Sequence, residues 1–225
     1  MKTVLTTVAA LVSLTMLGAT PAVAPAHGTP PAPLMAGGPP DTLVASPAAS
    51  SVRWHGTKFG GRGKHEGTVA LASGMFVIRH EMLTSGTFTI DMRSIAVTDI
   101  PESEPVPRRR LREHLLGKDF FDTARYPSAT FRSSGAERVG PSRWRINGNL
   151  TMRGVTHPLS FDADVQWPGT GHMVATSTFV LDRQKWGVAY RGSSLNDLVD
   201  DEMRISLTLD ARRKPKVVAT RAPRQ

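Results

Sequence analysis

Apolar and polar residues alternate along most of the chain between residues 51 and 211. The segment 86–97 places Phe88, Ile90 and Met92 on one side, with threonines and charged residues on the other. The same period of two recurs in the other candidate strands, which are 51–58, 143–153, 159–167, 173–181 and 203–211. Because successive side chains of a strand point to opposite faces, each segment has one apolar face and one polar face. The pattern predicts an all-β domain of antiparallel strands around a single apolar interior.

The number and length of these strands narrow the choice of architecture. The pattern gives about eight or nine candidate strands, and many of them are long. A two-sheet sandwich and a closed up-and-down barrel both accommodate such strands. Long strands in hairpin succession favour the barrel, because closure removes exposed strand edges. We therefore predict an extended eight-stranded antiparallel barrel, whose interior has room for side chains or one small ligand.

One excursion interrupts the run of strands. The segment 108–117 predicts a short helix, an adjacent aromatic pair follows at Phe120 and Phe121, and the Tyr126-Pro127 step marks a turn before a new strand. We expect the excursion to connect two barrel strands and to cover one end of the interior. The two phenylalanines are our candidates for a lid.

The two ends of the chain differ in composition from the domain. Residues 1–26 predict a secretory signal peptide, because Lys2 precedes an apolar run that is too short for a membrane span. The Pro- and Ala-rich residues 27–50 predict a disordered leader, and the basic residues 212–225 predict a disordered tail. The chain has no cysteine, so it forms no disulfide and carries no lipid on a lipobox cysteine. We expect a periplasmic or secreted protein whose domain spans residues 51–211.

The net charge of +9 is concentrated in two places. Residues 212–225 carry six lysines and arginines without an acid, and residues 108–112 carry four arginines. The simplest interpretation is a solvated basic surface, and the alternative is attraction to an anionic envelope surface. Nucleic acid is a poor candidate partner, because the basic residues lack interleaved aromatic side chains.

No sequence pattern indicates catalysis, a cofactor or a metal. The histidines lack metal-ligand spacing, the serines lack a G-x-S-x-G elbow, and no glycine-rich phosphate loop is present. Asp91 with Arg93, and Asp182 with Arg183, are interpreted as charge pairs on the barrel exterior. His65 is the histidine of interest, either as a contact for a ligand's polar head or as a structural hydrogen bond to a neighbouring strand. We expect a binding protein and no enzyme.

The inward positions are apolar, with small residues such as Gly148, Ala163 and Ala175 among them. A packed core is the simplest interpretation, and a narrow apolar slot for an aliphatic chain is the alternative. The candidate lining residues of such a slot are Trp54, Phe88, Ile90, Phe120, Phe121, Phe131, Ile146, Leu150, Phe161, Phe179 and Leu181. Cations near its mouth suit a phosphate or carboxylate head. The candidates are Lys58, His65, Arg109 and Arg112.

Seven motifs stand in an order that resembles the YceI-like family. They are V-x-W-x-G-x-K (52–58), G-K-H-E-G-T (63–68), G-T-F-T-I-D-M-R-S-I (86–95), D-F-F-D (119–122), Y-P-S-A-T-F (126–131), G-N-L-T-M-R-G-V-T (148–156) and D-R-x-x-W-G (182–187). The resemblance covers nearly the whole domain. It implies a lipocalin-like barrel of secreted or periplasmic bacterial proteins, which hold a polyisoprenoid or other long-chain amphiphile and often pair as homodimers. The leader, the Arg-rich insertion and the basic tail lie outside the shared pattern.

These observations favour a protein that holds a long-chain isoprenoid or acyl lipid in its barrel, for lipid transport, storage or envelope stress. The competing hypothesis is a ligand-free structural or stress-related envelope module with a fully packed barrel, which acts through basic surface contacts.

Overall fold

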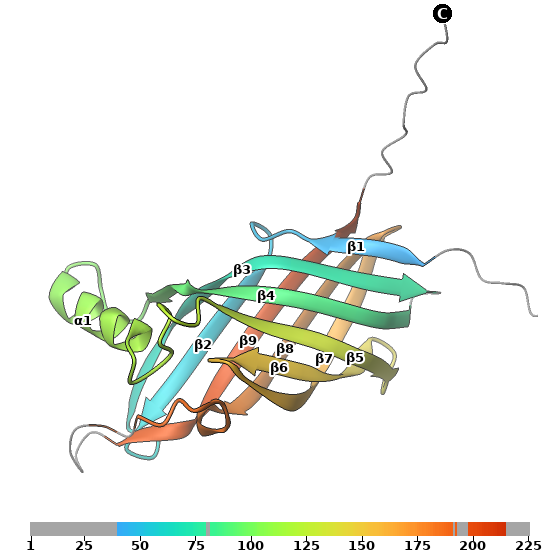
Figure 1. Ribbon diagram of the computed structural model, residues 1–225. Helices are drawn as coiled ribbons and strands as arrows, with labels where there is room; N and C mark the ends of the chain where they lie inside the picture. Colours follow the sequence, from blue (N-terminus) through green and yellow to red (C-terminus); the bar gives the residue numbers. More distant parts are fainter. Residues whose placement is uncertain (1–39, 80–81, 191, 193–197, 215–225) are drawn as a thin grey trace, which may run out of the picture. The chain divides into compact units, whose positions relative to one another are not determined.

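Nine strands among the described residues form one antiparallel sheet that closes into a barrel (Figure 1). Each strand from β2 to β9 pairs with the next one along the chain, and β9 returns to pair with β2. The closed ring therefore has eight positions, which confirms the predicted eight-stranded antiparallel barrel. The strands are β1 (Asp41–Ala45), β2 (Ser51–Lys58), β3 (Gly63–Arg79), β4 (Met82–Val97), β5 (Ser128–Arg138), β6 (Arg143–Met152), β7 (Val155–Gly169), β8 (His172–Asp182) and β9 (Val199–Arg213).

The structure is a computed structural model that describes residues 40–79, 82–190, 192 and 198–214. These residues all belong to the unit Gly37–Gln225. The expected signal peptide, most of the expected leader and residues 215–225 of the expected tail lie outside the described residues. Within the described ranges, no helix combines the length and the hydrophobicity needed to cross a bilayer.

Strand β1 corrects the expected boundary of the domain. It lies within residues 27–50, which the composition assigns to a disordered leader, and it pairs with both β3 and the end of β9. Strand β2 pairs with the same two neighbours farther along, so β1 and β2 share one position of the ring. Leu43 and Ala45 face the interior at 1% and 3% exposure, and this burial explains why the segment is ordered. At the other end, β9 runs to Arg213, two residues beyond the expected domain end.

A ladder of four phenylalanines crosses the barrel interior. Phe88 of β4 stacks on Phe131 of β5 with ring centroids 5.2 Å apart. Phe131 contacts Phe161 of β7 at 5.4 Å, and Phe161 stacks on Phe179 of β8 at 4.5 Å. Gly148 of β6 makes room for this ladder, because a Cβ there would lie 2.4 Å from the Phe131 ring. The aromatic contacts therefore fix how the inward faces of four strands fit together.

Helix α1 (Pro105–Leu116) lies between β4 and β5 at one end of the barrel (Figure 1). The helix follows the end of β4, which extends beyond the last β4 residue that pairs with β5. The backbone carbonyl groups at this end of β4 therefore need other partners. The Nε atom of Arg108 donates to the carbonyl of Val97 at 2.9 Å, and that of Arg112 donates to the carbonyl of Ile95 at 2.9 Å. Two of the four clustered arginines thus attach the helix to the edge of β4.

Strands β7 and β8 are joined by backbone pairing over only part of their length. Their paired residues run from Asp164 with Thr176 to Gly169 with His172. Beyond that region the 3-10 helix η1 (Arg183–Trp186) follows β8 and packs against the wall. The indole nitrogen of Trp186 donates to the carbonyl of Leu150 in β6 at 2.9 Å. The buried side chain of Trp186 therefore helps to close the barrel where the strands separate.

Candidate functional site

Two cavities lined by described residues share no lining residue. The first, which we call the barrel cavity, has a volume of about 50 Å³ and is lined by residues of the strands. The second, which we call the helix-side cavity, has a volume of about 220 Å³ and lies between the barrel and α1.

The barrel cavity is apolar. Four of the predicted lining residues, Phe88, Phe131, Ile146 and Phe161, surround it. The hydroxyl of Ser133 also faces it, but this hydroxyl donates to the carbonyls of Gly135 and Asn147, each at 3.2 Å. The other lining residues are Phe76, Ile78, Leu83, Gly86, Trp144, Ala163, Val165, Trp167, Met173, Ala175, Leu207 and Leu209. Such a surface binds hydrocarbon by removing it from water.

The helix-side cavity combines apolar and charged side chains in one space. The β2–β3 hairpin contributes Trp54, Gly56, Thr57, Lys58, Lys64 and His65. Its other walls come from α1, from the loop after α1, from η1 and its following loop, and from β9. These residues are Leu111, His114, Leu115, Phe120, Arg183, Tyr190, Val199, Asp200 and Met203. The arrangement suits a molecule with an apolar part and a polar head.

A layer of buried side chains separates the two cavities. Met203 of β9 lines the helix-side cavity and Leu207 lines the barrel cavity, while Ile205 between them lines neither. The same holds for four predicted lining residues, Ile90, Leu150, Phe179 and Leu181. All but Phe179 are less than 9% exposed, and Phe179 is partly buried and packs against this core. The predicted residues therefore divide into two cavity walls and a packed layer, not one continuous tunnel.

The predicted lid residues have different positions. Phe120 lines the helix-side cavity, where its ring contacts His114 at 5.0 Å and Tyr190 at 5.3 Å. Phe121 is buried beside Phe120, with ring centroids 6.0 Å apart, and does not reach the cavity lining. Phe120 with its two aromatic neighbours thus forms one wall of the helix-side cavity.

The four predicted contacts for a polar head do not come together. Lys58 and His65 line the helix-side cavity. Arg109 and Arg112 instead line a separate surface hollow on α1. Arg109 lies 3.8 Å from the carboxylate of Glu113, and Arg112 donates to β4 carbonyls. Arg109 and Arg112 are close in the sequence to residues of α1 that line the cavity, but the helical periodicity places them on another face of the helix.

His65 forms a structural hydrogen bond, as one of its two interpretations expected, and its contact with a ligand head stays a prediction. Its Nδ1 atom lies 2.8 Å from Oδ2 of Asp99, which follows β4, and the residue lines the helix-side cavity. The other carboxylate oxygen of Asp99 accepts a hydrogen bond from the backbone of Glu66 at 3.1 Å. The carboxylate therefore holds the imidazole ring in place at the cavity wall.

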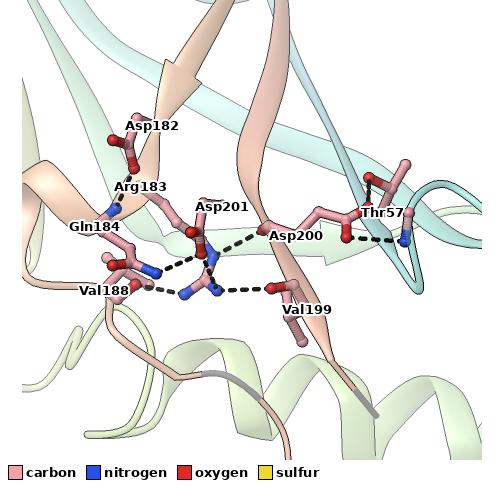
Figure 2. A network of polar contacts seen from close by, with 9 residues as sticks. Thr57, Asp182, Arg183, Gln184, Val188, Val199, Asp200 and Asp201 are labelled. Carbon is pink, nitrogen blue, oxygen red and sulfur yellow. Dashed lines mark hydrogen bonds and ion pairs between the residues drawn. The ribbon is translucent and has the colours of Figure 1, made fainter. Parts of the chain in front are cut away.

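Arg183 is the residue that the sequence interpretation placed wrongly. Its side chain is 1% exposed, so it is not part of an exterior pair with Asp182. Its guanidinium donates to the carbonyls of Val188, Val199 and Asp200, and lies 3.2 Å from the carboxylate of Asp201 (Figure 2). The carboxylate of Asp182 instead accepts from the backbone of Gln184 at 3.0 Å and begins η1. The buried cation joins η1, its following loop and β9.

The carboxylate of Asp200 holds the β2–β3 turn against β9 (Figure 2). It accepts hydrogen bonds from Oγ1 of Thr57 at 2.5 Å and from the backbone N–H groups of Gly60 and Gly61, each at 3.1 Å. Gly60 and Gly61 have φ values of +62° and +90°, which favour glycine. The hydrogen bond from Thr57 is the main reason that the pKa of Asp200 is lowered, and the two backbone donors add to it. Asp200 is therefore an anion that is already well supplied with donors.

Sequence reasoning named four of the fifteen residues that line the helix-side cavity: Trp54, Lys58, His65 and Phe120. The eleven that it missed include Lys64, Arg183, Tyr190 and Asp200. Lys64 and Arg183 belong to motifs that carry the family resemblance, and this was the available signal. Tyr190 and Asp200 stand in segments without a motif or a clear period. Only the fold brings them beside β2.

Comparisons with known proteins agree with this fold. Residues 43–211 match the model of the YceI-like domain. Protein YceI of Escherichia coli O157:H7 is 37% identical over 83 residues, which cover 35% of this chain and 43% of that relative. The chain thus spans less than half the length of the curated relative that it matches.

Two solved structures share the fold. BcnA of Burkholderia cenocepacia aligns with a TM-score of 0.57 at 22% identity, over 74% of this chain and 98% of that chain. A polyisoprenoid binding domain from Saccharophagus degradans, implicated in plant cell wall breakdown, aligns with a TM-score of 0.56 at 15% identity. This second alignment covers 78% of this chain and all of that domain. At these identities the likeness shows the barrel fold alone. With the domain match over most of its length, the chain belongs to the YceI-like family.

Proposed function

We propose that this protein binds a long-chain amphiphile, either a polyisoprenoid or a fatty-acid-like lipid. The polar head occupies the helix-side cavity, and the apolar chain extends into the barrel. The observation that carries the proposal is the helix-side cavity itself, where Trp54, Leu115 and Phe120 share one space with Lys58 and Lys64. The polyisoprenoid binding domain of Saccharophagus degradans, which shares the fold, supports it. Lipid transport, storage or a role in envelope stress are the functions we propose for such a complex.

The sizes of the two cavities define how the ligand is held. An apolar cavity of about 150 Å³ holds one benzene molecule, so the helix-side cavity, at about 220 Å³, has room for a head group and the first carbons. The barrel cavity, at about 50 Å³, holds only a few atoms. A long chain therefore needs the layer between the cavities to repack, which includes Phe179 of the phenylalanine ladder.

Burial of the apolar chain supplies the main free energy of binding. Burial of a methylene group contributes about 0.8 kcal/mol, so a chain of about 15 carbons contributes on the order of 12 kcal/mol. Micromolar affinity corresponds to about 8 kcal/mol. The difference of about 4 kcal/mol equals the lower end of the cost of association, about 4–15 kcal/mol, so contacts of the polar head must contribute to repacking the layer.

The direct test is to identify what the folded protein carries. The full chain is purified without detergent, analysed by native mass spectrometry, and extracted for lipid analysis. The delipidated protein is then titrated with palmitate and with farnesyl phosphate. We expect a co-purifying amphiphile and micromolar binding of at least one probe. An empty protein that binds neither probe would contradict the proposal.

The competing function is a ligand-free envelope module, and the small volume of the barrel cavity is the observation that favours it. Such a module would act through exposed basic side chains, for which Arg109 and Arg110 on α1 are candidates. It predicts binding to vesicles that contain anionic lipid, with no lipid extracted into the protein. Sedimentation with such vesicles, followed by lipid analysis of the released protein, separates the two functions.

A further inference from the structure

The indole nitrogens of two tryptophans depart from the usual hydrogen-bonded arrangement. Among the described residues, the buried side-chain nitrogen and oxygen atoms without a hydrogen-bond partner are the Nε1 atoms of Trp54 and Trp167. Trp54 lines the helix-side cavity, and Trp167 lines the barrel cavity. Trp186 shows the usual arrangement, since its Nε1 atom donates to the carbonyl of Leu150. A buried donor without an acceptor is unfavourable, so each such group requires an explanation.

The position of the Trp54 indole is built into the β2–β3 pair. Trp54 stands opposite Gly67 of β3 and Ile205 of β9. A Cβ at Gly67 would lie 2.7 Å from the indole ring and 1.8 Å from the carbonyl oxygen of Ala96. The absence of a side chain at Gly67 therefore allows the indole to lie against the β3 backbone. Strand pairing therefore fixes the position of Trp54, whose side chain lines the cavity.

The polar groups around the helix-side cavity are mostly donors. Trp54, Lys58 and Lys64 carry N–H groups and line it. Arg183 lines it too, but its guanidinium already donates to three backbone carbonyls. The one carboxylate of the lining, that of Asp200, already accepts three hydrogen bonds. The Nδ1 atom of His65 is occupied by Asp99. A ligand head that enters this cavity meets donors and needs acceptor atoms to match them.

We propose that the indole N–H of Trp54 is a specificity-determining donor, which binds an acceptor oxygen at the junction between the head and the chain of the ligand. The inference rests on the proposed function and specifies its ligand class. Amphiphiles with a carboxylate, ester, ketone or phosphate oxygen at this junction bind. Plain hydrocarbons and alkylammonium ions, which offer no acceptor there, are disfavoured.

The test compares Trp54→Phe with Trp186→Phe. Each change removes one indole N–H and keeps an aromatic ring, but Trp54 lines the helix-side cavity whereas Trp186 lines neither cavity. The probes are palmitate, methyl palmitate and hexadecylammonium, each below its micellar concentration. We expect Trp54→Phe to weaken binding of the two acceptor-bearing probes about fivefold or more, and Trp186→Phe to change the affinity of the folded protein less than twofold. Hexadecylammonium is expected to bind the wild type at least tenfold more weakly than palmitate.

A second measurement needs no variant. The sequence has four tryptophans, so the wild type shows few indole N–H signals in a proton–nitrogen correlation spectrum. We expect palmitate to shift the Trp54 signal downfield, as formation of a hydrogen bond does, and to leave the Trp186 signal in place. If the probes bind the wild type while Trp54→Phe binds them equally well and the Trp54 signal stays fixed, the inference is overturned and the proposed function stands. If the wild type binds none of these probes and no farnesyl phosphate, both are overturned.

Discussion

At the scale of single residues, we expect the buried Arg183 to contribute more to the free energy of unfolding than an exposed charge pair does. We expect Arg183→Met to lower the free energy of unfolding by about 3–5 kcal/mol, because it leaves three backbone carbonyls and the carboxylate of Asp201 without their cation. Urea denaturation followed by circular dichroism measures the change. Arg93→Ala is the matched control, since Arg93 forms an exposed pair with Asp91. The control should change stability by less than about 1 kcal/mol, and equal losses in both variants would contradict this account.

A second prediction at this scale concerns pH. Because the pKa of Asp200 is lower in the folded protein, its contribution to stability is full above the unfolded pKa of about 3.9 and is lost as the pH falls through the folded pKa. We expect Asp200→Asn to be less stable than the wild type at pH 7. The difference should shrink as the pH is lowered below about 4. Urea midpoints measured between pH 2 and pH 7 test this, and a difference independent of pH would contradict it.

Single residues also show what the sequence can and cannot predict. The exterior pair of Asp91 and Arg93 is confirmed, with the two side chains 3.2 Å apart, because neighbours on one face of a strand must lie close together. Asp182 and Arg183 are adjacent in the sequence, but β8 ends between them and the side chain of Arg183 is buried. Small inward residues such as Gly148 left a narrow slot open as the alternative to a packed core, and at Gly148 the ring of Phe131 fills the space. Local sequence defines which face a residue occupies, and distant residues define what fills the space beside it.

At the scale of elements, the alternating pattern predicts most of the long strands and the ends of the chain less well. Strands β2, β4 and β6 to β9 follow from their period of two, and β5 is the strand expected after Tyr126-Pro127. Strand β3 was not among the candidates, although it is the longest strand of the barrel. Strand β1 was missed because a segment of five residues beside prolines and alanines carries little periodic signal. The helix was expected at 108–117 and begins earlier, at Pro105, where proline is favoured in the first turn.

The contact between α1 and β4 gives a prediction for an element. Arg108 and Arg112 provide hydrogen bonds to β4 carbonyls that no strand supplies. We expect the double variant Arg108→Ala, Arg112→Ala to loosen the end of β4 by about 1–3 kcal/mol, which increases local hydrogen exchange there by roughly 5- to 100-fold. Arg110→Ala, which changes an exposed side chain of the same helix, is the control. Unchanged exchange of Ile95 and Val97 in the double variant would show that the helix is held by its apolar contacts alone.

At the scale of the whole barrel, the sequence predicted which side chains face inward but not that they enclose two separate spaces. The alternation assigns Phe88, Ile90 and Leu150 equally to the interior. Only the packing of rings across four strands decides that Phe88 borders a cavity while the other two belong to the layer between cavities. The expected pairing of two copies stays a prediction, since a chain's own interior carries no information on it. The proposed binding of a long chain therefore requires the two cavities to become continuous.

This leads to a prediction about the barrel cavity. Ala175→Leu places three more carbons in a space of about 50 Å³ that Ala175 lines. If the lipid chain extends through the layer into this cavity, we expect the variant to bind palmitate at least tenfold more weakly, while its stability to urea is equal to that of the wild type or greater, because a void is filled. Val180→Leu is the control, since Val180 lies on the outer face of the same strand at 49% exposure. Loss of binding without loss of stability would locate the chain in the barrel. Tight binding by Ala175→Leu would instead confine the whole ligand to the helix-side cavity, and the layer of Ile90, Leu150 and Leu181 would then be a permanent floor.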